Sequence, residues 1–276
     1  MKILMNKKNV HDLKNWFTAY VKAFKYDNYE LQKNIDIKRE HTESVAEEIK
    51  NIGKQLGLND NELNLAEIIA LFHDIGRFEQ YDRYKTFSDN KSENHAELGI
   101  KILKQYDVLD LLDENLQKVI LCSIRYHNLP KLPGDETDTC LFYSRLIRDA
   151  DKLDIWRVVT DYYHRKNGER NVALELELPD TPGISAEVHK AMMNKQIVDV
   201  KHVKNINDIK LLQAGWIYDI NFKPTFECIK NRRYIESLRD ALPKMIEVTD
   251  IFDIIKSYIE DRDGNYFPVK ISQEYF

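Results

Sequence analysis

The chain has 276 residues, of which 43% are hydrophobic and 32% are charged, a balance typical of globular proteins that bury a sizeable core. Its formal net charge is −5 at pH 7 and its sequence pI is about 6.0. This acidic excess argues against a protein that coats a nucleic acid polymer or an anionic membrane, because such proteins present basic surfaces.

Long stretches of the chain repeat apolar residues at helical spacing, and only nine glycines and seven prolines interrupt them. In chain order, this spacing predicts helices at about 10–28, 38–57, 60–76, from near 93 onward, and at about 113–127, 137–163, 185–197, 207–219, 224–241 and 246–261. Residues 172–178, VALELEL, alternate in the manner of a short strand. We expect an all-α fold in which residues 1–276 form a single domain, with a core at about 30–165 and a C-terminal helical extension at about 185–262.

Neither a targeting segment nor a disulfide framework is evident. No run approaches the ~20 apolar residues that cross a bilayer, and the apolar stretch at the N-terminus is too short for a signal-peptide core. The cysteines Cys122, Cys140 and Cys228 are odd in number and widely scattered, which fits neither paired bridges nor a close-spaced zinc motif. We expect a cytoplasmic protein with reduced thiols and no membrane partner.

Ionisable residues recur at the ends or on the apolar faces of successive predicted helices. They are His41, His73, Asp74, His95, His127 and Asp151. One buried imidazole is usually a satisfied core histidine, but burying unpaired ionisable groups costs several kcal/mol each. Because the pattern repeats on five consecutive helices, a shared metal site in the bundle core is the better interpretation.

The types of these side chains restrict the ion. Four imidazoles and two carboxylates without sulfur suit divalent iron, manganese, cobalt, nickel or zinc, whereas calcium prefers all-oxygen shells. His73 and Asp74 are adjacent, so a regular helix would separate them by about 100° and prevent both from facing one ion. A tightened or terminating turn would bring them together, and Gly76 just downstream favours such a turn.

The order of His41, His73-Asp74 and Asp151 resembles the signature of the HD superfamily of metal-dependent phosphohydrolases. The segments ALFHDIGRF and RDADKLD are similar to its two most diagnostic stretches, and the resemblance covers roughly residues 38–157. His95 in NHAELG and His127 in RYHN resemble the branch of the family that holds two metals.

The resemblance implies a helical-bundle core in which Asp74 bridges two divalent ions. His41, His73 and Asp151 would complete the shell of one ion, and His95 and His127 would hold the other. Two such ions would activate a water as hydroxide and stabilise the charge of a phosphoryl transition state. No serine nucleophile is then needed, and the chain has no G-x-S-x-G motif.

Three basic residues near the motifs are candidates for phosphate contact. Lys152 follows Asp151, at the place where the family motif carries a lysine that is linked to phosphate binding. Arg77 lies three residues after Asp74 and Arg148 lies nearly one turn before Asp151, and a guanidinium matches phosphate geometry. We expect Asp74, Lys152 and Arg77 to serve catalysis, and Arg148, Lys152 and Arg77 to bind substrate.

The sequence therefore predicts a phosphohydrolase that cleaves a small phosphate ester, with nucleotides among the candidate substrates. Two alternatives remain open at this stage. A few relatives use the same ligand set as a mixed-valent di-iron site for oxygen-dependent cleavage of C–H or C–P bonds. A protein of this fold could also sense a nucleotide without turning it over, although degenerate relatives would be expected to lose ligands and this chain keeps all six.

Overall fold

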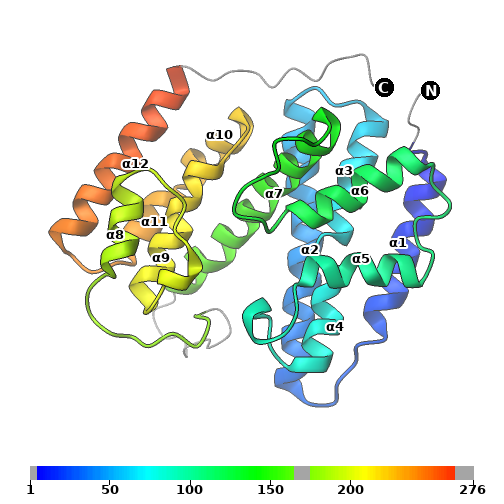
Figure 1. The fold of residues 1–276 in the computed structure, drawn as a ribbon, viewed down its shortest axis with the longest axis horizontal. Helices are drawn as coiled ribbons and strands as arrows, with labels where there is room; N and C mark the ends of the chain where they lie inside the picture. The colour runs from blue at the N-terminus through cyan, green and yellow to red at the C-terminus, as the bar shows by residue number, and fades with distance from the viewer. Residues whose placement is uncertain (1–4, 165–174, 265–276) are drawn as a thin grey trace. The chain divides into compact units, whose positions relative to one another are not determined.

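The computed structural model describes residues 5–164 and 175–264, and every regular element within these ranges is helical (Figure 1). The prediction of an all-α fold is confirmed. Of the predicted strand at 172–178, residues 172–174 lie outside the described ranges, and 175–178 form a turn in which Leu178 N donates to Glu175 O. No described helix is both long enough and apolar enough to cross a membrane.

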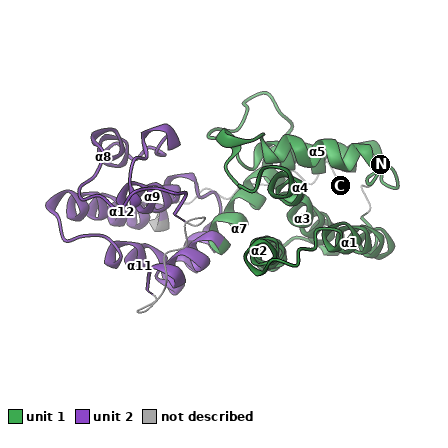
Figure 2. Cartoon of the chain, turned by 90° about the horizontal axis from the view of Figure 1, so that it is seen from below, with its two compact units in different colours: residues 1–154, 269–276 green, residues 155–268 purple. Residues whose placement is uncertain are grey.

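The chain divides into two compact units, with the boundary between Asp154 and Ile155 (Figure 2). The helices up to the boundary are α1 (Lys7–Lys22), α2 (Tyr29–Gln55), α3 (Asp60–Phe72), α4 (Ile75–Tyr84), the short 3-10 helix η1 (Asp89–Lys91), α5 (His95–Gln105), α6 (Glu114–Tyr126) and α7 (Asp138–Tyr163), which carries the boundary itself. The second unit continues with α8 (Ala186–Met193), η2 (Val200–His202), α9 (Ile206–Gly215), η3 (Trp216–Asp219), α10 (Lys223–Arg232), α11 (Tyr234–Asp240) and α12 (Ile246–Gly264).

Short polar residues define where several of these helices begin and end. Asn59 caps α3 in a capping box with Glu62, in which each side chain accepts from the other residue's backbone N–H. At the end of α2, Gly57 adopts φ +80, Gly57 N donates to Lys54 O, and Leu58 N donates to Gly53 O. These are the bonds of a Schellman motif, in which the left-handed conformation of Gly57 ends α2.

Helix α3 is the centre of the first unit. Every side chain from Leu65 to Phe72 is buried, and the helix packs against α1, α2 and α6. A helix buried on all sides must be surrounded by protein, and its one charged side chain in this stretch, Glu67, is paired with Lys14 and Lys50. Because α3 ends at Phe72, the following His73 and Asp74 lie at the inner end of the core.

The helix predicted at 60–76 is in fact two helices. α3 ends at Phe72 and α4 begins at Ile75, and Asp74 between them has non-helical torsion angles, φ −107 and ψ 15. This break is the terminating turn that the adjacent His73 and Asp74 require in order to face a common point.

Helices α4 and α5 approach each other through two glycines. A Cβ added to Gly76 would lie 2.1 Å from the carbonyl oxygen of His95 and 2.7 Å from the backbone nitrogen of Gly99. Backbone therefore packs on backbone here, which brings the first turn of α4, next to Asp74, against the first turn of α5, which carries His95.

We predict that Gly76→Ala lowers the free energy of unfolding by about 1–3 kcal/mol or more, because α4 and α5 must separate to admit the methyl group. Urea denaturation measures this change. Gly134→Ala is the matched control: a Cβ at Gly134 meets no atom within 4 Å, so its effect should stay within about 0.5 kcal/mol. Equal stability of the two variants would contradict the close packing of α4 on α5.

Candidate metal centre

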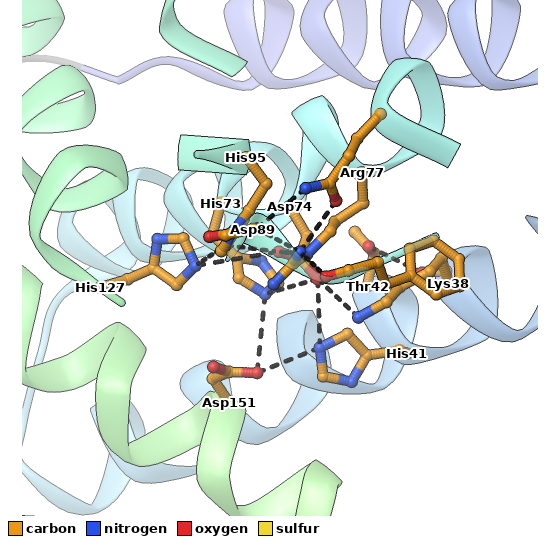
Figure 3. A network of polar contacts seen from close by, with 12 residues as sticks. Lys38, His41, Thr42, His73, Asp74, Arg77, Asp89, His95, His127 and Asp151 are labelled. Atoms are coloured by element: carbon orange, nitrogen blue, oxygen red, sulfur yellow. Dashed lines mark hydrogen bonds and ion pairs between the residues drawn. The ribbon is translucent and has the colours of Figure 1, made fainter. Parts of the chain in front are cut away.

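The six predicted ligands converge on one buried region of the first unit (Figure 3). His41 lies on α2, His73 and Asp74 form the break between α3 and α4, and His95 opens α5. His127 directly follows α6, and Asp151 lies on α7. The imidazoles and Asp74 are buried, and the Asp151 side chain retains 18% exposure. Residues separated by more than 100 positions in sequence thus surround one point.

The two oxygens of Asp74 face different histidines. Oδ2 lies 3.8 Å from His41 Nε2 and 3.9 Å from His73 Nε2. Oδ1 lies 3.3 Å from His95 Nε2 and 3.8 Å from His127 Nε2. Asp74 therefore presents one oxygen to each of two pairs of imidazoles.

Asp151 adds a second carboxylate to the first of these pairs. Its Oδ1 lies 3.1 Å from His41 Nε2 and 3.7 Å from His73 Nε2. Three groups of ligand atoms each fall within 4.8 Å of one another: His41 with His73 and Asp74, Asp74 with His95 and His127, and His73 with His127 and Asp151. The first two groups correspond to the two halves around Asp74, and the third joins the halves.

Each imidazole is oriented by a hydrogen bond from its Nδ1. The four acceptors are Asp154 Oδ2 for His41 (2.7 Å), Ala70 O for His73 (2.7 Å), Asp89 Oδ2 for His95 (2.8 Å) and Ile124 O for His127 (2.6 Å). His73 and His127 are held in the same way. Each follows the last residue of its helix and donates to the carbonyl three residues earlier, one of the carbonyls that have no partner within the helix.

These hydrogen bonds place the proton of each neutral imidazole on Nδ1 and leave the lone pair of Nε2 directed at the centre. His73 Nε2 is buried and has no hydrogen-bond partner among the described residues. His95 Nε2 and His127 Nε2 lie only 3.0 Å apart. Converging lone pairs with an unpartnered buried nitrogen fit divalent cations, which would satisfy these atoms.

Electrostatics favours the ligand forms of these residues. Burial, followed by the neighbouring His95 and His73, lowers the pKa of His127 to about 3, and burial and Arg77 also lower the pKa of His95. Both imidazoles are therefore neutral at pH 7. Burial opposes the ionisation of Asp74, but nearby Lys38, His73 and Arg77 hold its pKa well below the usual range.

The other half of the site, around His41 and Asp151, favours charged side chains. Burial opposes the imidazolium of His41, yet hydrogen bonds to Asp151 and Asp154 raise its pKa to about 9. Burial likewise opposes the ionisation of Asp151, and the nearby imidazoles of His41 and His73, whose Nε2 atoms lie 3.1 and 3.7 Å from Oδ1, keep its pKa well below the usual range. His41 thus lies between two carboxylates that attract positive charge, an environment equally suited to a metal cation.

The three basic candidates lie close to this cluster but are heavily engaged. Arg77 Nη1 donates to Gln80 Oε1, Phe87 O and Asp89 Oδ1, and its Nε lies 3.5 Å from Asp74 Oδ1. Buried Lys152 donates from Nζ to Arg148 O at 3.2 Å.

Buried Arg148 holds the end of α6 in place. Its Nη1 donates to the carbonyl oxygens of Tyr126, His127 and Leu129. Arg148 therefore positions the turn that carries His127, a role that the sequence did not indicate, and its contact with substrate stays a prediction.

Several residues of the site were missed at the sequence level. Asp154 and Asp89 orient His41 and His95, and Lys38 Nζ lies 3.0 Å from Asp74 Oδ2. Asp154, three residues after Asp151 in RDADKLD, could have been found from its helical spacing. Asp89 begins the short helix η1 in the connection between α4 and α5, where no periodicity marks it.

Asp89 belongs to a buried polar network. Gln80 is fully buried, and its Nε2 donates to Asp89 Oδ1, Ser92 Oγ and Glu93 O at 2.8–2.9 Å. Arg77 and His95 Nδ1 donate to the same Asp89 carboxylate. The network fixes the α4–α5 connection and, through Asp89, the ring of His95.

Residues 39–156 match the HD domain family, and the chain therefore contains an HD domain over these residues, with further helices on either side. The HD family consists largely of metal-dependent phosphohydrolases and typically binds divalent metals. The buried histidines and aspartates form clusters able to hold such ions. No curated protein and no solved structure matches the chain.

We predict that Asp89→Ala weakens one metal-binding event by about 10–100-fold, because His95 loses the acceptor that fixes its ring, and leaves a second event nearly unchanged. Calorimetric titration of chelator-treated protein with Mn²⁺ measures both affinities. Asp110→Ala removes the same charge from an exposed position and serves as the control. If both metal-binding events weakened equally, or if neither weakened, the result would contradict a role of Asp89 that is confined to the half of the site formed by His95.

Proposed function

We propose that this chain is a metal-dependent phosphohydrolase that cleaves a small phosphate ester, with nucleotides among the candidate substrates. The observation that carries the proposal is that the two oxygens of Asp74 face two separate pairs of imidazole nitrogens. The HD domain at residues 39–156 supports the same reaction class.

In this proposal the six residues would hold two divalent ions, drawn from iron, manganese, cobalt, nickel or zinc, and Asp74 would serve both. His41, His73 and Asp151 complete the donors on the Oδ2 side. His95 and His127 complete them on the Oδ1 side. Imidazole nitrogen and carboxylate oxygen are donors that all of these metals accept.

Bound ions of this kind lower the pKa of a coordinated water and so supply hydroxide near neutral pH. The protein's own contribution is to fix the geometry and the charge. Asp74 and Asp151 cancel two of the four positive charges, so the site keeps a net positive charge that attracts a phosphate. Burial of the imidazoles removes competing solvent, which strengthens that attraction.

Lys152 and Arg77 complete the proposed catalytic set. Lys152 follows Asp151 on α7, and Arg77 borders the Oδ1 side of Asp74. Both carry positive charge at the edge of the ion site, where they would offset the charge of the phosphate as it is transferred. We also retain Arg148 as a substrate-binding candidate, acting at the end of α6 where its guanidinium is anchored.

The test combines metal content with turnover. We predict that Asp74→Ala loses nearly all bound metal and phosphoesterase activity, because the bridging carboxylate serves both ions, while His127→Ala retains about one ion of two. Elemental analysis gives the metal content, and release of p-nitrophenol from bis(p-nitrophenyl) phosphate with added Mn²⁺, alongside a panel of nucleotides, gives the activity. His11→Ala removes an exposed histidine on α1 and should change neither quantity.

Two outcomes would contradict the hydrolase. Turnover by iron-loaded protein that requires oxygen and a reduced substrate would identify the mixed-valent di-iron oxygenase instead. Nucleotide binding without product in every metal form would identify a sensor. Full metal content in Asp74→Ala would contradict the bridging role itself.

A further inference from the structure

Lys38 is a basic residue at the metal centre that lies outside the sequence motifs and one residue before the segment that matches the HD domain family. It lies on α2, nearly one turn before His41, and its Nζ is 3.0 Å from Asp74 Oδ2 (Figure 3). The ammonium also lies 5.4 Å from the centre of the Phe87 ring, whose face attracts cations. Oδ2 is the oxygen of Asp74 that faces His41 and His73.

Lys38 differs from the two arginines of the site in the groups that its charged end contacts. The guanidinium of Arg77 is shared among an amide, a carbonyl and a carboxylate, and that of Arg148 among three carbonyls. Turning either group toward a substrate would leave several buried acceptors unpaired. Lys38 has a flexible four-carbon stem, its side chain is 20% exposed, and its ion-pair partner among the described residues is Asp74.

The position of Lys38 also conflicts with a cation held at Asp74 Oδ2. An ammonium 3.0 Å from that oxygen and a divalent ion bound to it by His41 and His73 would share one negative charge and repel each other. The rotatable ammonium can relieve the repulsion by moving to a second anion near the ions. A phosphate attracted to the same ions is such an anion.

We propose that Lys38 is a phosphate-binding residue that exchanges the Asp74 carboxylate for a phosphate oxygen of the substrate when the Oδ2 side of the site holds an ion. The inference rests on the proposed function and extends it. It assigns recognition of the phosphate group on the Oδ2 side to α2, whereas the sequence motifs suggest α4 and α7. It also predicts that Lys38 opposes metal binding while it favours phosphate binding.

Opposite effects on two ligands make this inference testable in the full chain. The experiment titrates Mn²⁺ into chelator-treated protein, and then inorganic phosphate into Mn²⁺-loaded protein, with both affinities measured by calorimetry. Lys38→Met removes the charge at nearly constant length, and Lys38→Arg keeps the charge. Lys33→Met removes an exposed lysine from the same helix as the matched control.

For Lys38→Met we expect phosphate affinity to fall at least about tenfold, because one charge-assisted hydrogen bond is lost. We expect the affinity for Mn²⁺ to stay equal or to rise. Lys38→Arg should bind phosphate within about threefold of the unmodified chain, and Lys33→Met should match it in both titrations. If circular dichroism shows that Lys38→Met is unfolded, Lys38→Gln takes its place.

Two results would overturn the inference. The first is unchanged phosphate affinity in Lys38→Met. The second is a parallel loss of Mn²⁺ and phosphate affinity, which would make Lys38 a structural support of Asp74. The proposed function fails separately, if the unmodified chain holds no ions or hydrolyses no phosphate ester. If the unmodified chain hydrolyses esters and Lys38→Met binds phosphate with the same affinity, only the inference about Lys38 is contradicted.

Discussion

The burial of one ionised carboxylate, that of Asp74, is the constraint on which the first unit depends. A buried carboxylate without compensation would cost several kcal/mol or would take up a proton. Asp74 is 4% exposed, and the surrounding elements each place a positive or polar group against it. Helix α2 supplies Lys38 and His41, α4 supplies Arg77, and α5 and α6 contribute their histidines. The convergence of these elements therefore follows from a single electrostatic requirement, which two divalent cations would meet more fully than the side chains alone.

A second set of hydrogen bonds orients the histidines themselves. Each Nδ1 donates to a fixed acceptor, two of them backbone carbonyls at helix ends and two of them carboxylates. Backbone acceptors cannot move without unwinding their helices, so His73 and His127 are set by α3 and α6 themselves. Of the two carboxylates, Asp89 is held in turn by the network around Gln80. The site is thus oriented by the fold before any ion binds, which reduces the entropic cost of coordination.

The sequence was sufficient for the parts of the structure that periodicity and ligand chemistry specify. The helical class follows from apolar spacing, and His73 beside Asp74 required the break that α3 and α4 provide. Local spacing was less informative about extent: α2 begins at Tyr29, well before the predicted residue 38, because its first turns carry few apolar residues. Asp89 and Arg148 act through tertiary contacts with His95 and the end of α6, which no periodic pattern encodes. The assignment of ligands to individual ions, and of residues 1–276 to a single domain, stay predictions.

The central claim is that Asp74 bridges two ions, and anomalous diffraction from a crystal grown with Mn²⁺ tests it most directly. The account predicts two manganese peaks about 3.5–4 Å apart, one near His41 and His73 and the other near His95 and His127, with Asp74 between them. A single peak, or peaks that leave Asp74 outside the coordination shell, would contradict it.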